Sequence, residues 1–270
     1  MRRGALAAAA AVAAVAWGCR AIPAPANGVL SVSEVQLPSP GVVVGDTMRD
    51  SAGRAAPLRV YAFGVGGQAD TITKVAATFV VFDRGAHVTA DGYLIGDSVR
   101  STPVRVVGSV GSLQTSAANV AVIPVPDSIG PVGPTTIAPD TFSLAKPPSY
   151  YSAAMTANVS SAGAPPQAVP SLIVRWVIVR RPAGAPNDTA STIVSTNNFA
   201  ASADTTDASG NVSVRLHLDP VAGQALTAPD SFVVEARASY RGMPLRGSPV
   251  RFVVPIVPAL GASATRSGKP

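Results

Sequence analysis

One stretch of the sequence brings together residue types that could support nucleophilic catalysis. His87 lies between Asp83 and Asp91, and Ser98 follows shortly after. A Ser-His-Asp triad needs these three groups to converge beside an oxyanion hole. The chain carries no G-x-S-x-G motif, which would place a serine on a sharp turn between a strand and a helix. We therefore expect a turn-rich loop here, no catalytic residues anywhere, and a protein that is not an enzyme.

A second group of polar residues could in principle bind calcium. Asp204, Asp207 and Asn211 cluster around Gly210. An EF-hand loop needs carboxylates at its positions 1, 3 and 5 and a bidentate Glu at position 12, and neither condition is met here. The single Cys and two His of the chain also rule out an intrachain disulfide and leave little for a zinc or iron–sulfur site. We predict a hairpin turn at this point, no metal site and no cofactor.

Three tyrosines are candidates for contact with a ligand. Tyr150 and Tyr151 are adjacent and lie near a domain joint, and Tyr93 follows a predicted Asp-Gly turn. Aromatic side chains on loops can bind sugars through their faces. Trp176, in contrast, alternates with Val174 and Ile178 on one face of a strand, so we expect a core tryptophan there.

The excess of basic residues does not indicate nucleic-acid binding. The chain has 21 Lys and Arg against 15 Asp and Glu, a formal charge of +6. A nucleic-acid interface needs a clustered basic stripe with aromatic residues or a known motif. The arginines are instead scattered, and Arg180-Arg181 is the one doublet after the N-terminal segment. We expect them on solvated strand faces and predict no nucleic-acid partner.

The N-terminal segment is typical of an export signal. Two arginines precede the uncharged stretch 4–17, and Gly18 and Cys19 follow at once. This stretch fits the apolar region of a signal peptide and is shorter than the roughly 20 residues that span a bilayer. It resembles a bacterial lipoprotein signal, in which a peptidase cuts before a Cys that is then acylated. The resemblance implies a signal peptide at 1–18, lipidation of Cys19 and a membrane as partner.

Two features of the sequence allow an alternative cleavage site in this segment. Trp17 departs from the residues usual at that point of a lipoprotein signal, and Ala24-Pro25-Ala26 offers an ordinary cleavage site. Cleavage after Ala26 would give a soluble secreted protein instead of one anchored to a membrane. In the lipidated form, residues 19–28 would be a flexible spacer.

The rest of the chain has the pattern of short strands and turns. Gly and Pro together exceed their usual share, which argues against an all-helical protein. In 211–218 and 232–240 apolar and polar residues alternate, as in strands with one buried and one solvent-exposed face. We expect His217, Arg215 and Glu235 on the solvent-exposed faces of these strands. Further runs of this kind predict strands at 58–65, 75–82, 104–110, 119–125 and 172–179.

The spacing of these strands predicts two tandem antiparallel β-sandwiches in an all-β chain. The Pro-rich stretch 124–148 is typical of a linker or of a joint between terminal strands. We expect one immunoglobulin-like domain at 28–127, a linker at 128–147 and a second such domain at 148–257. Residues 258–270 are expected to form a disordered tail.

Residues 203–218 resemble a turn-and-strand signature of a known family. Thr206, Asp207, Gly210, Val212, Val214 and Leu216 match the T-D-x-x-G-x-A/V-x-V-x-L run of bacterial immunoglobulin-like domains of the invasin/intimin type. The resemblance covers roughly 148–257 and implies modular sandwiches that act as spacers, stalks or adhesive modules. It brings no catalytic residues with it, and a fold alone does not define a function.

These observations favour a non-enzymatic module of the bacterial cell envelope. We expect an exported, lipid-anchored immunoglobulin-like spacer or adhesion protein whose partner is an envelope protein or a glycan. The alternative is a secreted or surface protein that binds glycans through Tyr93, Tyr150 and Tyr151.

Overall fold

The computed structural model describes residues 29–64, 69–71, 77–138, 150–182, 191–219 and 230–256. The predicted signal peptide 1–18, the spacer 19–28 with Cys19 and the tail 258–270 lie outside these residues. The described residues contain strands and no helix, so the all-β prediction is confirmed. No helix long and apolar enough to cross a membrane occurs among them.

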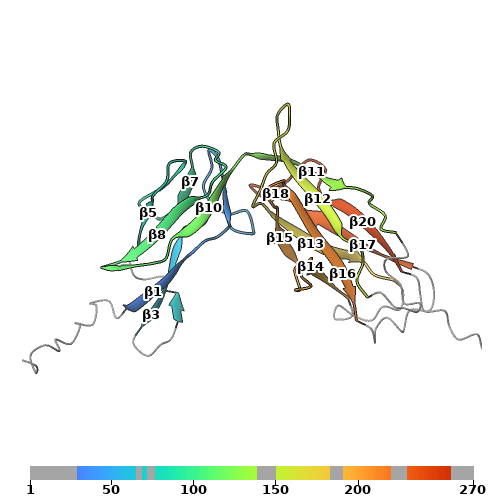
Figure 1. The fold of residues 1–270 in the computed structure, drawn as a ribbon, viewed down its shortest axis with the longest axis horizontal. Coiled ribbons are helices and arrows are strands. Elements are labelled where there is room, and N and C mark those ends of the chain that lie inside the picture. The colour runs from blue at the N-terminus through green and yellow to red at the C-terminus, as the bar shows by residue number, and fades with distance from the viewer. Residues whose placement is uncertain are drawn as a thin grey trace, which may run out of the picture.

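The first sandwich packs a small sheet against a larger one (Figure 1). The small sheet has the order β1-β3-β4, and the larger one the order β2-β10-β8-β5 with β9 beside β8. A separate hairpin, β6-β7, lies between β5 and β8 in the sequence. The strands are β1 (Val29–Gln36), β2 (Gly41–Val43), β3 (Arg59–Gly64), β4 (Ala69–Thr71), β5 (Thr78–Val81), β6 (Ala86–Val88), β7 (Leu94–Gly96), β8 (Val104–Val110), β9 (Leu113–Gln114) and β10 (Ala118–Ile123).

The second sandwich has two four-stranded sheets, β11-β12-β16-β14 and β15-β13-β17-β20, and a small hairpin, β18-β19. Its strand order matches the A-B-E-D and C-F-G sheets of an immunoglobulin domain, with β15 added beside β13. The strands are β11 (Pro126–Val132), β12 (Met155–Ser161), β13 (Ile173–Arg180), β14 (Ser191–Ser195), β15 (Ala203–Thr205), β16 (Asn211–Leu218), β17 (Asp230–Arg237), β18 (Ser239–Tyr240), β19 (Met243–Pro244) and β20 (Val250–Ile256).

The core of the second sandwich follows the predicted alternation. The apolar residues of β16 are all buried, and so are Phe232, Val234 and Ala236 of β17. Trp176 is 2% exposed, and its ring lies 5.8 Å from that of Phe252 on β20. The prediction of a core tryptophan is thus confirmed, and burial of these side chains is the main favourable contribution to folding.

The position of the linker differs from the expected one. β10 ends at Ile123 and β11 begins at Pro126, so that residues 124–125 alone connect the sandwiches. Residues 128–138 of the expected linker belong to the second sandwich instead: β11 pairs with β12, and Ile137 donates a backbone hydrogen bond to Val253. Residues 139–149 lie outside the described residues. β11 is the edge strand of its sheet, and on its other side it forms an isolated bridge to Arg246 in place of a continuous ladder. Prolines are tolerated in such an edge strand.

Candidate functional site

The two sandwiches meet at a joint in which the apolar core continues from one to the other. Val43 at the end of β2 and Ile123 at the end of β10 are buried in the same cluster as the core of the second sandwich. Beside them Gly41 lies so close to Ser171 that a Cβ atom would be 3.1 Å from the Ser171 carbonyl oxygen. Close packing of this kind resists small shifts, because interiors have few voids to absorb them.

Asp46, which follows the last residues of β2, is the polar centre of this joint. It is 7% exposed. Its carboxylate accepts hydrogen bonds from Arg49 Nε at 2.8 Å in its own sandwich, and from Tyr240 Oη at 2.8 Å and Arg241 Nε at 3.1 Å in the other. A buried carboxylate with several donors is well satisfied, whereas a missing donor would leave an uncompensated charge. Asp46 therefore ties the β18-β19 hairpin to the first sandwich.

The ionisation of this cluster is set by burial and hydrogen bonding together. Burial alone raises the pKa of Asp46, but the bonds from Arg49, Arg241 and Tyr240 outweigh it and hold that pKa well below its usual range. Burial, and then the bond to Asp46, raises the pKa of Tyr240 to about 12. At neutral pH the carboxylate is thus charged and the phenol is a neutral donor.

Two further contacts connect the sandwiches. Arg175 on β13 donates from its Nη2 to the Ser51 carbonyl oxygen at 2.6 Å. Gly53 has a φ of 79° and lies against Gly242, where a Cβ atom would be 3.0 Å from the Gly242 nitrogen. The turn at Ser51–Gly53 thus rests directly on the second sandwich.

A second charged group lies on the outer face of the β17 sheet. The alternation predicts that Glu235 is exposed to solvent, but its side chain is 3% exposed, because Arg237 and Arg251 cover it. Its carboxylate accepts from Arg237 Nη2 at 2.7 Å and from Arg251 Nε at 2.8 Å. These bonds, that of Arg237 first, hold the pKa of Glu235 below its usual range although burial raises it.

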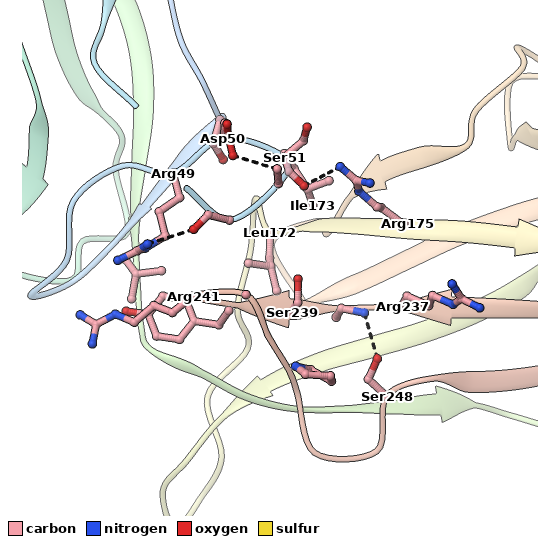
Figure 2. Close-up of a pocket in the computed structure, with 18 of the residues that line it drawn as sticks. Arg49, Asp50, Ser51, Leu172, Ile173, Arg175, Arg237, Ser239, Arg241 and Ser248 are labelled. Carbon is pink, nitrogen blue, oxygen red and sulfur yellow. Dashed lines mark hydrogen bonds between the residues drawn. The ribbon is translucent and has the colours of Figure 1, made fainter. Parts of the chain in front are cut away.

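A cleft of about 770 Å³ runs between these two groups, along the joint. Figure 2 shows Arg49 and Arg241 towards one end of the cleft and Arg175 and Arg237 towards the other. Leu172 and Ser239 lie between them. This volume is within the range of small-molecule sites. The cleft is the candidate functional site of the described part of the chain.

The residues considered for catalysis are not brought together. His87 on β6 contacts Asp97, with Nδ1 and Oδ1 2.8 Å apart, and not Asp83 or Asp91. Asp83 instead accepts bonds from the side chain and backbone nitrogens of Arg105, which lower its pKa to about 2.

The acidic cluster around Gly210 forms a turn. The Asp207 carboxylate accepts from the backbone nitrogens of Ser209 and Asn211, as Asp does in tight turns. Asp204 accepts from the backbone nitrogen of Thr205. Within the described ranges, no three His, Cys, Asp or Glu gather as a metal site.

The three candidate tyrosines belong to different places in the fold. Tyr150 packs against the core of the second sandwich, and Tyr151 is 38% exposed with its ring 4.6 Å from that of His217. Tyr93 lies at the tip of the β6-β7 hairpin in the first sandwich, where its backbone nitrogen bonds Thr89. A role of these tyrosines in ligand binding stays a prediction.

Sequence reasoning missed the cleft. The spacing of Asp46 and Arg49 was visible in the sequence, but their partners Tyr240 and Arg241 lie more than 190 residues away along the chain. No local pattern reports such a distant contact.

Comparisons with known proteins give no family. No family model matches the chain, and neither does any curated protein. Among solved structures, the adhesin InvE of Yersinia pseudotuberculosis is 14% identical, with 85% of this chain and 61% of that chain covered and a TM-score of 0.32. Residues 31–844 of the S-layer protein SbsC are 14% identical, with 85% of this chain and 28% of that chain covered and a TM-score of 0.31.

A glycosyl hydrolase family 2 member from Bacteroides cellulosilyticus is 10% identical, with 76% of this chain and 24% of that chain covered and a TM-score of 0.28. The chain thus spans less than two thirds of each of these three proteins. Likenesses this weak, to proteins this different, carry no argument about function.

Replacing Asp46 by Asn is expected to loosen the joint and to lower the free energy of unfolding by about 2 kcal/mol at neutral pH, because bonds to a charged acceptor are lost. The folded pKa of Asp46 lies below its unfolded value, so its contribution is complete above about pH 4 and is lost as the pH falls towards the folded pKa. Thermal unfolding from neutral to acid pH checks this: the variant should have a lower midpoint at neutral pH and a smaller acid-induced loss.

Asp83→Asn is the matched control. Asp83 also has a lowered pKa, but its partner Arg105 is an exposed residue of the same sandwich. Such surface pairs contribute little. If the two variants had the same unfolding midpoint at every pH, Asp46 would have no special role at the joint.

Proposed function

We propose that this chain is a non-enzymatic module of a bacterial cell envelope in which two immunoglobulin-like sandwiches form one stiff spacer or adhesive unit. The observation that carries the proposal is the joint. Two residues connect β10 to β11, the apolar core continues through Val43 and Ile123, and Asp46 bonds the β18-β19 hairpin. A flexible pair of domains would instead have a long polar linker and a small, wet interface.

The module is held at a membrane by acylation of Cys19 in this proposal. Cys19 precedes β1, so the lipid would attach on the side of the first sandwich and the second would lie further along the chain from the anchor. Several acyl chains on one residue give stable anchoring, whereas a single chain binds only marginally. Attachment through the first sandwich leaves the joint and the second sandwich available to a partner.

The Cys19→Ser variant tests the anchor. Made in a bacterial host and labelled with radioactive palmitate, the natural chain should carry label, begin at Cys19 and fractionate with membranes. The variant should carry no label and leave the membrane fraction. A natural chain that begins at Asn27 and is soluble would contradict lipid anchoring and would make this a free secreted module.

A second candidate function is glycan binding. The partial exposure of Tyr151, whose ring lies tilted beside that of His217, favours it, because an exposed aromatic face can hold a sugar. Binding on a glycan array that is lost in Tyr151→Ala would support it, and an array without signal would exclude it.

A further inference from the structure

The cleft at the joint has a basic surface, because five arginines and three carboxylates line it and two of the carboxylates are buried. The carboxylates at its two ends are buried: the side chains of Asp46 and Glu235 are 6% and 3% exposed. Their arginine partners are far more exposed, at 54% for Arg241, 51% for Arg237 and 70% for Arg251. The side facing solvent therefore carries mainly guanidinium groups. The third carboxylate of the lining, Asp50, is half-buried and accepts bonds from the backbone nitrogens of Ala52 and Arg54.

Two guanidinium groups of the cleft use only one of their N–H donors in a hydrogen bond to a described residue. Arg251 uses Nε for Glu235 and Arg175 uses Nη2 for the Ser51 carbonyl oxygen. No hydrogen bond from their remaining nitrogens to another described residue is present, although the charge of Arg175 acts on the nearby Asp50 carboxylate and helps to lower its pKa. A guanidinium presents five donors in a planar fork that matches a carboxylate, and a second acceptor adds to the first without replacing it.

Between its charged ends the cleft is lined by apolar and small side chains. Leu172, Ile173 and Ala238 contribute from the β13 and β17 strands and the segments beside them, and Pro244 and Pro249 from the turns around β19. Such a surface suits the aliphatic parts of a chain that also carries charges.

The cleft offers little to the face of a sugar ring. Tyr240 is the aromatic residue among the described lining residues. Its hydroxyl is bound to Asp46, and the guanidinium of Arg241 lies over the ring, 5.3 Å from its centroid. Sugar recognition usually needs an open aromatic face, so the lining favours a peptide over a glycan.

We propose that this cleft binds an acidic peptide segment of a partner protein, with carboxylates on Arg175 and Arg251 and aliphatic side chains over Leu172. The proposal rests on the stiff joint of the proposed function, because residues of both sandwiches line the cleft. Charge complementarity with exposed arginines would mainly speed association and make it sensitive to salt.

The test uses the full chain and a fluorescein-labelled decapeptide of alternating Glu and Val, with its Lys and Val counterpart as a negative probe. Fluorescence anisotropy should show saturable binding of the acidic probe that weakens as salt is added, and no binding of the basic one. Arg175→Gln and Arg251→Gln should each weaken binding roughly fivefold, the effect of one partly exposed ion pair. Each leaves the bond between Arg237 and Glu235 in place. Because Arg175→Gln also removes the bond to the Ser51 carbonyl oxygen across the joint, the distance distribution between the sandwiches is measured for this variant too and should stay narrow.

Arg180→Gln is the matched control, because Arg180 is also on β13, is 58% exposed and is paired with Asp230, but does not line the cleft. It should leave the affinity unchanged. Equal losses in all three variants, or no binding of the acidic probe at low salt, would overturn the proposal.

An oligogalacturonate in place of the peptide separates a glycan from a protein partner. If the sugar bound with the same dependence on Arg175 and Arg251 while the peptide did not, the peptide assignment would be wrong. Failure of the stiff joint itself would be detected independently, as a broad distribution of distances between the sandwiches in the absence of any ligand.

Discussion

Replacing Trp176 by Ala is expected to lower the free energy of unfolding of the second sandwich by about 3–5 kcal/mol, the usual effect of removing a large buried ring. Trp176 is 2% exposed and packs against Phe252 across the β13 and β20 strands. Because a domain is stable by only about 5–15 kcal/mol, the variant should unfold at a much lower urea concentration. Circular dichroism in urea measures this, and a loss below about 1 kcal/mol would contradict the core assignment.

Trp176→Phe is the control for this substitution. The indole Nε1 is buried and has no hydrogen-bond partner among the described residues. Phe retains an aromatic contact with Phe252 and removes this unsatisfied donor, which on its own is costly to bury. We therefore expect a loss of less than about 1.5 kcal/mol.

The second large effect is expected at Gly210, in the turn before β16. Its φ is 77°, and a Cβ atom would lie 2.5 Å from the Val159 carbonyl oxygen on β12. The Gly210→Ala variant has both a strained backbone and a clash with a strand that cannot move freely. Strain of this kind costs about 1–3 kcal/mol, and the clash adds to it, so we expect about 3 kcal/mol in total. Urea unfolding again gives the value.

Gly133→Ala separates the two causes. Gly133 has a φ of 80°, nearly that of Gly210, but nothing lies within 4 Å of its Cβ position. Its substitution should cost only the backbone strain, about 1 kcal/mol. If Gly133→Ala and Gly210→Ala were equally destabilising, the contact with Val159 would have no energetic role.

Most of the strands could be predicted from alternation of apolar and polar residues. β16 occupies the predicted residues 211–218, and β8 the predicted residues 104–110. In β16, Val and Leu on one face alternate with polar residues on the other, so the pattern alone defines which face is buried. In β8 the pattern is less regular, because Val107 lies on the outer face and Gly108 on the buried one.

The strands that were missed have a weaker pattern. β12 has the sequence MTANVSS, in which Ala and Ser stand at inward positions where larger side chains are usual. β11 contains two prolines, so the sequence predicts a linker over most of it, because proline normally interrupts a strand. Its place at the edge of a sheet is a property of the tertiary structure, which a local pattern does not contain.

The candidate site could not have been predicted for the same reason. Glu235 alternates with buried residues, so the sequence predicts an exposed side chain, yet arginines from β17 and β20 cover it. Asp46 meets Tyr240 and Arg241 only when both sandwiches have formed. Polar residues that bond across domains carry no periodic signal, so their pairing becomes visible only in three dimensions.

The central claim is that the two sandwiches form one stiff unit through the Asp46 joint. The most direct measurement is the distance distribution between spin labels at Ser112→Cys, on the turn after β8, and Ser209→Cys, before β16, in a chain with Cys19→Ser. Both positions are exposed. We expect one narrow distance distribution by double electron–electron resonance, which broadens when Asp46→Asn is added. A broad distribution in the chain with Asp46 intact would contradict the stiff joint and with it the proposed spacer.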